Sequence, residues 1–478
     1  MNTPATTNHA TYQHAIVIGG SMAGLTAARV LTNHFAKVTI IERDSPPSAD
    51  GYHPGVPQGR HPHILLGLGQ KLLAEMFPGL FNQLLTNGAV PVNFGSEFQF
   101  FVGGGWAQPS AAKISGVGCS RPLLENAIYQ RLAAHPSVQI LHEKLVVGLT
   151  TDGHGQRTTG VQMCERHNPT APSTTLTADL VVDASGRDSH ALEWLAGLGY
   201  TPPQETTINA FVGYSTRIYR RPAAFADTWK LLYVMPMYPH TPRGGIISPM
   251  EGDRWQVGLV GLNGDYPPTD ETGFLEFARS LPTPRLYEAI KDAEPLSDPR
   301  GYRRAENRMR YYEKLPRYLE NFLVTGDAVY AFNPVYGQGM STAALASQTL
   351  DACLRKQGKQ SLDGLAQRFQ KALAGVAAGP WQMATGQDVR WPKTVGGHAA
   401  DPLTRIKQRY LDRVLAAMPH SAHVTEAFLY VNNMLKPPTS LFQPKIIWQA
   451  LKPTGWHNTE KLPQAAMPMV QSPQMGGN

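Results

Sequence analysis

The feature that most constrains the fold is a glycine-rich turn between two apolar runs near the N-terminus. Residues 15–18 (AIVI) predict a buried strand, the turn GGSMAG follows at 19–24, and residues 25–32 predict a helix. A second apolar run, 37–41, ends at an acidic residue, Glu42. A strand, glycine turn, helix and second strand ending in an acid are typical of a dinucleotide-binding βαβ unit. The pattern therefore predicts an α/β fold.

Each residue of this unit has an expected task. Gly19 permits the tight turn, and Gly24 lets the helix pack closely on the strand. Ser21 stands at the second glycine of G-x-G-x-x-G, and this small residue still allows a pyrophosphate to approach. Glu42 can accept hydrogen bonds from an adenosine ribose. An ordinary βαβ turn without a ligand is the alternative. Two neighbours are assigned to the same site, Ala23 and Arg43.

A second strand–turn–helix pattern lies at residues 322–350. An apolar strand is predicted at 322–325, Gly326 and Asp327 interrupt it, and an Ala-rich helix is predicted at 343–350. Unpaired amide N–H groups and the positive end of the helix dipole would suit an anionic, planar ligand at this turn. The loop before the helix contributes the candidates Pro334, Tyr336, Gly337, Gly339 and Met340.

Two further segments carry polar candidates. Ser120 is a suitable N-cap for a helix that begins at Arg121, whose guanidinium could reach a phosphate or ribose. A surface arginine is the alternative. The Pro- and Gly-rich loop 46–62 ends near Arg60 and His61, and we expect it to lie against a cofactor. His61 and His63 lack further ligands at a useful spacing, so no metal site is predicted.

Residues 207–264 change to long alternating strands, which predict an antiparallel sheet with one covered face. Aromatic and sulfur-containing side chains on these strands are candidates for a substrate pocket, although sheet core is the alternative for each of them. The candidates are Phe211, Tyr233, Met235, Met237 and Trp255. Helices are predicted beyond residue 380, at 403–418 and 422–435.

Composition excludes several classes of protein. A chain of 478 residues predicts two or three packed domains, and 42% hydrophobic with 17% charged residues is ordinary for a globular enzyme. The net charge of +7 is modest, and the basic segment 300–314 interleaves acids, so nucleic-acid binding is not expected. Three dispersed cysteines, no signal peptide and no apolar run near ~18 residues predict a reduced, cytoplasmic protein without stable membrane insertion.

Three motifs far apart in the chain together resemble one family. They are GGSMAG with Glu42, ASGRDS at 184–189, and GDAVYAFNPVYGQGM at 326–340. Over residues 14–375 the chain resembles the group A flavoprotein monooxygenases, the para-hydroxybenzoate hydroxylase-like family. The resemblance implies a discontinuous Rossmann-like FAD-binding domain with an inserted antiparallel substrate sheet and a C-terminal helical region. The expected bounds are 14–92, 117–205 and 315–378 for the FAD-binding domain, 93–116 and 206–314 for the sheet domain, and 379–478 for the helical region.

The resemblance also implies roles for residues. The βαβ residues Gly19, Ser21, Gly24 and Glu42 would hold the ADP half of FAD. Arg121 would contact its phosphate or ribityl region, and Asp327 the ribityl chain or pyrophosphate. Pro334 to Met340 would lie along the flavin ring, with backbone N–H groups near its carbonyl edge. No catalytic side chain is assigned, and Tyr336 and His61 are expected only as polar neighbours of the ring.

Within this family, several stretches are most similar to the flavin-dependent epoxidases of polyether antibiotic biosynthesis. They include PGVPQGRHPHILL, SRPLLE and FNPVYGQGM. This resemblance implies transfer of one oxygen atom from O₂, through a flavin C4a-hydroperoxide, to an organic substrate in secondary metabolism. The aromatic and sulfur-containing pocket candidates favour an apolar substrate such as a polyene or polyketide. Epoxidation and hydroxylation both stay open. Ser185 and Gly186 replace an Asp-Gly pair associated with FAD and NAD(P)H, so NAD(P)H would act directly or through a separate flavin reductase.

Three other functions fit the same fold. A flavin-dependent halogenase would carry a Trp-x-Trp-x-Ile-Pro motif and an essential lysine, and neither is found in the sequence. A flavin-dependent double-bond reductase would share the ASG element but would not consume oxygen with its substrate. A non-enzymatic prenyl-binding protein would purify colourless and would take up no added FAD.

Overall fold

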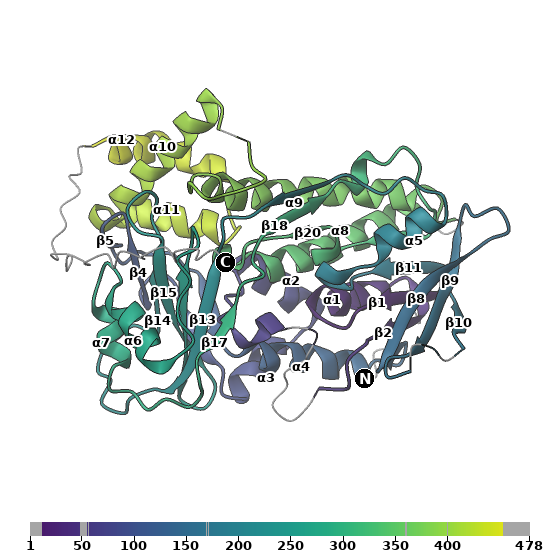
Figure 1. Cartoon of the computed structure of the whole chain (residues 1–478), viewed down its shortest axis with the longest axis horizontal. Coiled ribbons are helices and arrows are strands. Elements are labelled where there is room, and N and C mark those ends of the chain that lie inside the picture. The colour runs from purple at the N-terminus through teal and green to yellow at the C-terminus, as the bar shows by residue number, and fades with distance from the viewer. Residues whose placement is uncertain are drawn as a thin grey trace, which may run out of the picture.

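The computed structural model describes residues 12–47, 55, 57–168, 170, 172–358, 361–398 and 400–452 (Figure 1). Parts of two predicted segments, 48–54 and 56 in the Pro- and Gly-rich loop and 453–478 in the C-terminal region, lie outside these residues. The protein has an α/β architecture with a parallel sheet, antiparallel sheets and C-terminal helices. The predicted fold class is confirmed.

A five-stranded parallel sheet forms the centre of the first part, in the order β19-β11-β1-β2-β7. Two of the three inner strands, β1 and β2, are fully buried along residues 15–18 and 38–41, as the apolar runs predict. The bounds are β1 Tyr12–Ile18, β2 Phe35–Ile41, β7 Val138–Leu141, β11 Leu180–Asp183 and β19 Phe322–Val324.

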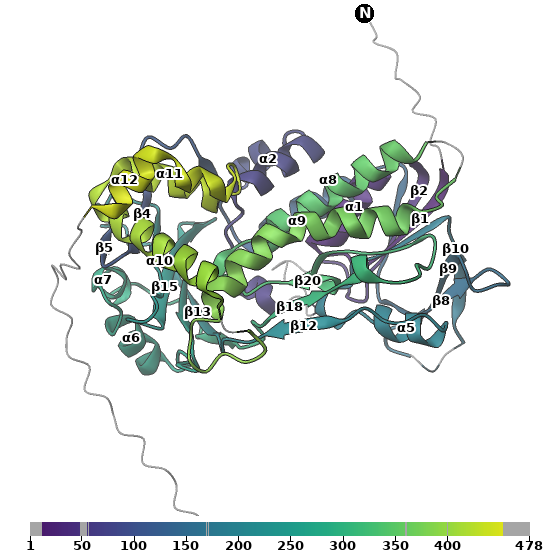
Figure 2. The ribbon, with the colours of Figure 1, turned by 90° about the horizontal axis from the view of Figure 1, so that it is seen from above.

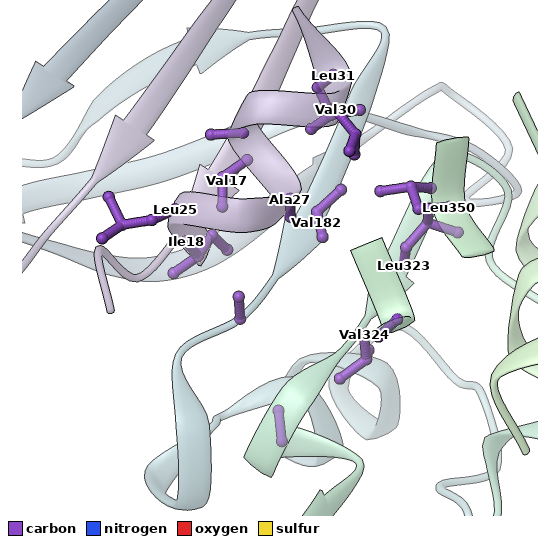
Figure 3. Packing of buried hydrophobic residues seen from close by; sticks show 14 of the residues in the cluster. Val17, Ile18, Leu25, Ala27, Val30, Leu31, Val182, Leu323, Val324 and Leu350 are labelled. Atoms are coloured by element: carbon purple, nitrogen blue, oxygen red, sulfur yellow. The ribbon is translucent and has the colours of Figure 1, made fainter. Parts of the chain in front are cut away.

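Helices from distant parts of the chain cover this sheet. Figure 3 shows buried side chains of α1, β1, β11, β19 and α8 packed into one cluster, which joins residues near 20 to residues near 340. The two predicted turn-and-helix units thus lie side by side, and α1 packs directly on α8. The helices of this part are α1 Met22–Leu31, α2 Gly67–Met76, α3 Leu80–Thr86, α4 Arg121–Ala133, α5 Ala191–Gly197, α8 Gly339–Gln357 and α9 Leu365–Asp388.

A seven-stranded sheet forms the second part, in the order β17-β13-β16-β15-β14-β4-β5. All its pairs are antiparallel except β14 with β4. The helices α6 Glu271–Arg279 and α7 Arg285–Ile290 bury one face of the sheet. The strands are β4 Phe98–Val102, β5 Gly105–Trp106, β13 Gly213–Arg220, β14 Leu231–Val234, β15 Arg243–Met250, β16 Arg254–Gly261 and β17 Arg300–Tyr302.

Smaller sheets connect and flank these parts. One three-stranded sheet, β8 Lys144–Thr151, β9 Thr158–Glu165 and β10 Thr174–Thr177, extends from the parallel sheet as an antiparallel meander. The other joins β12 Glu205–Ile208, β18 Asn307–Arg310 and β20 Tyr330–Ala331, which link the two parts (Figure 2). A two-stranded ladder pairs β3 Val90–Asn93 with β6 Ser115–Gly118.

Three C-terminal helices, α10 Pro402–Ala417, α11 Ala422–Asn432 and α12 Pro444–Leu451, gather at one end of the molecule beside β4 and β5 (Figures 1 and 2). The domain bounds stay a prediction, but one of them meets a difficulty. A boundary after residue 378 cuts α9, which continues through Pro380. Burial of Leu373 and Ala377 before the proline and of Ala384 after it holds the helix together, because packing outweighs the local cost of proline. In the part of the chain described, no helix is long and apolar enough to cross a membrane.

Candidate functional site

A cavity of about 540 Å³ lies between the carboxyl ends of the parallel strands and one face of the seven-stranded sheet. Most of the predicted cofactor residues line it, from both glycine turns and the intervening segments. Those lining residues are Gly19, Ser21, Ala23, Glu42, Arg43, His61, Arg121, Asp327, Pro334, Tyr336, Gly337, Gly339 and Met340.

The first glycine turn is fixed by close backbone contacts. Gly19 has φ +102°, and a methyl group built on it would lie 2.6 Å from the carbonyl oxygen of Ala184. Gly24 lies behind the turn, where a methyl group would be 1.8 Å from the carbonyl oxygen of Gly19. Neither site tolerates a side chain without movement of the backbone. The two glycines therefore set how closely α1 approaches the end of β1.

A buried cluster of three side chains lies at the start of α1. The Ser21 hydroxyl donates to Glu125 Oε1 at 2.6 Å, and Arg121 Nη2 donates to the same oxygen at 2.9 Å. Glu125 also accepts from the Met22 amide at 3.1 Å. Arg121 Nε is buried without a hydrogen-bond partner among the described residues, although it belongs to a side chain that lines the cavity. The cluster holds a cation beside a helix N-terminus, which suits an anionic ligand.

Glu42 lies at the tip of β2, as the sequence pattern predicts. Its Oε2 accepts from the Gly20 amide at 2.5 Å and its Oε1 accepts from the Asp44 amide at 2.8 Å. These bonds hold the carboxylate at the edge of the cavity, beside Arg43. Arg60 is not among the lining residues, in contrast to its predicted role. Arg60 is the last residue of a short 3₁₀ turn, Pro57–Arg60, and its carbonyl accepts a hydrogen bond from Gln256 Nε2.

The second glycine turn presents the N-terminus of α8 to the cavity. Gly337 has φ +65°, and a methyl group built at Gly339 would meet no atom within 4 Å. The helix begins at Gly339, earlier than the Ala-rich run suggests, and Gln338 provides no side-chain cap. The first amides of α8 therefore lack partners within the helix and are open to a ligand.

The loop before α8 is anchored by a carboxylate that the sequence analysis did not identify. Asp388, at the end of α9, is 1% exposed. It accepts from Tyr336 Oη at 2.7 Å, Asn333 Nδ2 at 3.0 Å and Asn307 Nδ2 at 2.6 Å. Asn333 Oδ1 in turn accepts from Tyr214 Oη at 3.0 Å. Burial raises the pKa of Asp388, while these hydrogen bonds oppose that rise.

Two of the three histidines that line the cavity, His61 and His63, have neutral rings, and the third is His190. Burial lowers the pKa of His61 to about 4, and its Nδ1 lies 2.8 Å from Thr216 Oγ1. Burial also lowers the pKa of His63 to about 3. His63 Nδ1 donates to the carbonyl of His61 at 2.7 Å, because a carbonyl can only accept. Among the described residues, no three or more His, Cys, Asp or Glu side chains are grouped so that they could hold a metal ion.

Aromatic side chains form the wall at the other end of the cavity. Phe100 stacks on Phe98 at 5.2 Å and on Tyr233 at 5.6 Å, and it faces Phe428 of α11 at 6.1 Å between ring centroids. Tyr233 and Met235 line this end, as predicted for a substrate pocket. Further apolar lining comes from Phe94, Ile246 and Val260.

Three of the predicted pocket residues lie outside the cavity lining. Trp255 is 1% exposed and stacks on Trp229 at 5.8 Å within the core under α6 and α7. The strand period explains this position, because Gly258 and Val260 of β16 face the cavity, so odd-numbered residues face the other side. Met237 packs in the core of the C-terminal helices, and Phe211 lies in a turn with φ +49°.

Comparison with known proteins identifies the family. A family model described as "FAD binding domain" (FAD_binding_3) matches residues 12–363. The chain belongs to this FAD-binding family. It is 30% identical over 405 residues to Protein Rv3254 of Mycobacterium tuberculosis, covering 82% of each chain.

Solved flavoproteins share the fold at low sequence identity. A flavoprotein/dehydrogenase from Cytophaga hutchinsonii has a TM-score of 0.61 at 16% identity, over 91% of this chain and 96% of its own. The p-nitrophenol 4-monooxygenase PnpA from Pseudomonas putida has a TM-score of 0.58 at 16% identity, over 89% and 99%. The flavin-dependent halogenase CmlS has a TM-score of 0.58 at 17% identity, over 89% and 77%. The fold is thus one that flavin-dependent monooxygenases and halogenases share.

The residues of the cavity fit FAD. The unpartnered Arg121 Nε and the N-terminus of α1 suit a pyrophosphate, and the carboxylate of Glu42 suits ribose hydroxyls. The open space at Gly339 leaves room for a planar ring against the N-terminus of α8. The family match supports FAD binding by this chain, whereas the role of each of these residues stays a prediction.

Replacing Asp327 by alanine is expected to weaken FAD binding about tenfold to a hundredfold without unfolding the protein. Its carboxylate lines the cavity, is 41% exposed and lies 3.8 Å from Arg187 Nε, so its removal costs little stability. The lost affinity corresponds to one hydrogen bond to a charged group. Titration of apoprotein with FAD measures the change. Asp363→Ala, an exposed carboxylate beside Arg157, is the control. Unchanged affinity in Asp327→Ala would remove this residue from the site.

Proposed function

We propose that the protein is an FAD-dependent monooxygenase that transfers one oxygen atom from O₂ to an apolar organic substrate. The observation that carries this proposal is one cavity with two chemically different ends. Glycine turns, helix N-termini and Arg121 lie at one end, and stacked aromatic rings of the seven-stranded sheet lie at the other. The second glycine turn, at Gly337 and Gly339, lines the same cavity, so that a ring bound there would face the aromatic end.

The chain supplies three functions in this proposal. The unpaired amides and the dipole of α8 stabilise negative charge at the ring edge. The aromatic wall excludes water and holds an apolar carbon skeleton. Asp388, Asn333 and Tyr336 fix the loop that precedes α8. Bound, reduced FAD supplies the activation of O₂.

Among the possible reactions, epoxidation of an alkene suits the cavity best. Hydroxylation of a phenol benefits from a base that ionises the substrate. Of the three histidines that line the cavity, His61 and His63 are weak bases, because burial lowers the pKa of the first to about 4 and of the second to about 3. His190 lies at the start of α5, on the FAD-binding part and not on the aromatic wall. An alkene needs no proton removal before it reacts. The aromatic and apolar lining at this end of the cavity supports a polyene or polyketide as the substrate.

The reductant in this proposal is NAD(P)H, used directly or through a separate flavin reductase. Ser185 lies two residues after β11, where the resemblance to group A monooxygenases implies the aspartate of an Asp-Gly pair. Its amide and hydroxyl both donate to Asp183, at 2.9 and 2.5 Å. The hydroxyl proton is thereby directed into the protein. This arrangement favours the separate reductase.

Incubation under ¹⁸O₂ tests the proposal. The protein is supplied with NADH and a purified flavin reductase, and squalene, styrene and indole serve as probes. We expect a product that carries one ¹⁸O atom, and no label when ordinary O₂ is used in ¹⁸O-water. A brominated product in a bromide buffer would favour a halogenase. A saturated product formed without oxygen consumption would favour a double-bond reductase, and either result would replace the proposed function.

A further inference from the structure

The C-terminal helices expose an unusual number of large apolar side chains. Ten such residues are exposed in the described part of the chain, and six of them lie between residues 403 and 451. The exposed fraction reaches 62% at both Ile406 and Trp448. The six are Leu403, Ile406, Leu435, Phe442, Trp448 and Leu451, here called the C-terminal apolar surface. Exposed apolar residues mark an interaction site where they lie together, and those of α10 and α12 are linked by the contact of Tyr410 with Phe442.

In α10 the apolar stripe extends beyond the core. Leu403, Ile406, Tyr410, Val414 and Ala417 recur at helical spacing on one face. Val414 and Ala417 are buried against α12, whereas Leu403 and Ile406, two turns earlier, are exposed. The first half of α10 therefore presents an apolar face that no described part of the chain covers.

In α12 the exposed apolar residues lie opposite the core. Ile446 and Ala450 are buried, so Trp448 and Leu451 point outward. Lys445 and Lys452 are exposed on the same outward side, and Lys452 Nζ lies 3.6 Å from the Trp448 ring centroid. Phe442, just before α12, stacks on Tyr410 of α10 at 4.8 Å and links the two helices.

The charges around this surface are mainly basic. Residues 400–452 contain seven Lys or Arg and three Asp or Glu. Of the acids, Asp412 pairs with Arg390 at 2.7 Å, and Asp401 accepts from the Thr404 amide at the start of α10. Basic residues with tryptophan and leucine on exposed helix faces match the chemistry of an anionic lipid surface. A second copy of this chain would bring like charges together.

We propose that the C-terminal apolar surface docks onto a membrane surface that contains anionic lipid, without spanning it. Trp448, Leu451 and the first half of α10 enter the headgroup region. Lysines and arginines of α10 and α12 contact the lipid headgroups. The proposed partner is therefore a lipid surface. Binding of a protein partner or of a second copy of the chain would contradict the proposal.

Docking would bring the cavity close to the membrane. Phe428 and Asn432 of α11 line the apolar end of the cavity, and α11 packs against α12 and the turn Pro438–Phe442. An apolar substrate dissolved in the bilayer would thus lie near the apolar end of the cavity. This step rests on the proposed function, whereas docking itself does not.

Co-sedimentation of the full-length, FAD-loaded protein with vesicles tests docking independently of activity. We expect binding to vesicles of phosphatidylcholine with one quarter phosphatidylglycerol, and much weaker binding to pure phosphatidylcholine or in high salt. Trp448→Ala with Leu451→Ala, and separately Lys445→Glu with Lys452→Glu, should each weaken binding at least about tenfold. Val147→Ser, at an exposed valine of β8, should bind like the wild type.

Retained flavin content shows that each variant is folded. Equal binding of the wild type to neutral and anionic vesicles would overturn the lipid-charge argument. Absence of vesicle binding would overturn the proposal, and self-association that the Trp448 and Leu451 changes abolish would assign the surface to a second copy. If docking holds but no probe is oxygenated, the docking surface stands and the proposed function fails.

Discussion

Gly24→Ala is expected to yield protein that retains little or no FAD. The added methyl group would lie 1.8 Å from the carbonyl oxygen of Gly19 and 3.4 Å from Val17 Cγ1. Because the first contact is to backbone, no side-chain rotation relieves it, and α1 must move away from β1. The movement displaces the N-terminus of α1 and opens the turn from which the pyrophosphate would be bound. A bulkier residue at position 24 should abolish FAD retention.

The ratio of flavin to protein absorbance after purification measures this effect, with circular dichroism as the check on folding. Gly375→Ala is the matched control, since it places the same methyl group in α9 with no atom within 4 Å. That control should be stabilised by about 0.5–1 kcal/mol, because alanine favours helix over glycine. A stably yellow Gly24→Ala protein would contradict the assignment of residues 19–24 to the cofactor.

The sequence predicts the elements whose chemistry is local. The turn at 19–24 and the loop at 334–340 each depend on glycines within a few residues of one another, so the pattern alone indicates a ligand-binding turn. The structure brings the two turns to one cavity, although more than 300 residues separate them. The periodicity of the sequence does not predict that the two turns line one cavity. Only the family resemblance predicted that both turns bind the same cofactor.

The wrong pocket predictions have a physical cause. On β16 both faces are buried, one against helices and one against the cavity, so hydrophobic alternation does not distinguish them. Trp255 was therefore as good a candidate as Val260. Phe98 and Phe100, which do line the cavity, belong to β4, outside the strands first considered for the pocket. Their pairing with β14, 133 residues later, is a long-range contact without a local signal.

The two missed carboxylates differ in how far they could be predicted. Glu125 follows Arg121 by four residues on α4, and this spacing places both side chains on one helix face. That signal was present in the segment SRPLLE. Asp388 contacts Tyr336 across 52 residues, beyond the matched family region of 12–363. No spacing in the sequence relates the two, so only the structure reveals the pair.

Asp388→Ala is expected to destabilise the protein by about 3–5 kcal/mol and to lower FAD affinity. The change removes the acceptor of three hydrogen bonds, which leaves the donors on Asn307, Asn333 and Tyr336 unsatisfied. Each unsatisfied buried donor costs about 1–3 kcal/mol, and the side chains relax only partly. Asn333 and Tyr336 belong to the loop before α8, so the loss extends to the turn that would hold the flavin ring.

Thermal unfolding with and without added FAD separates the two effects. Tyr336→Phe removes one of the three donors and leaves the carboxylate two others, so we expect a loss of about 1–2 kcal/mol, smaller than that of Asp388→Ala. Asp298→Ala, at an exposed aspartate, should behave like the wild type. If Asp388→Ala were destabilised but bound FAD normally, the carboxylate would only stabilise the junction of α9 with the loop. Loss of FAD affinity beyond that of Tyr336→Phe would show that the end of α9 shapes the flavin site.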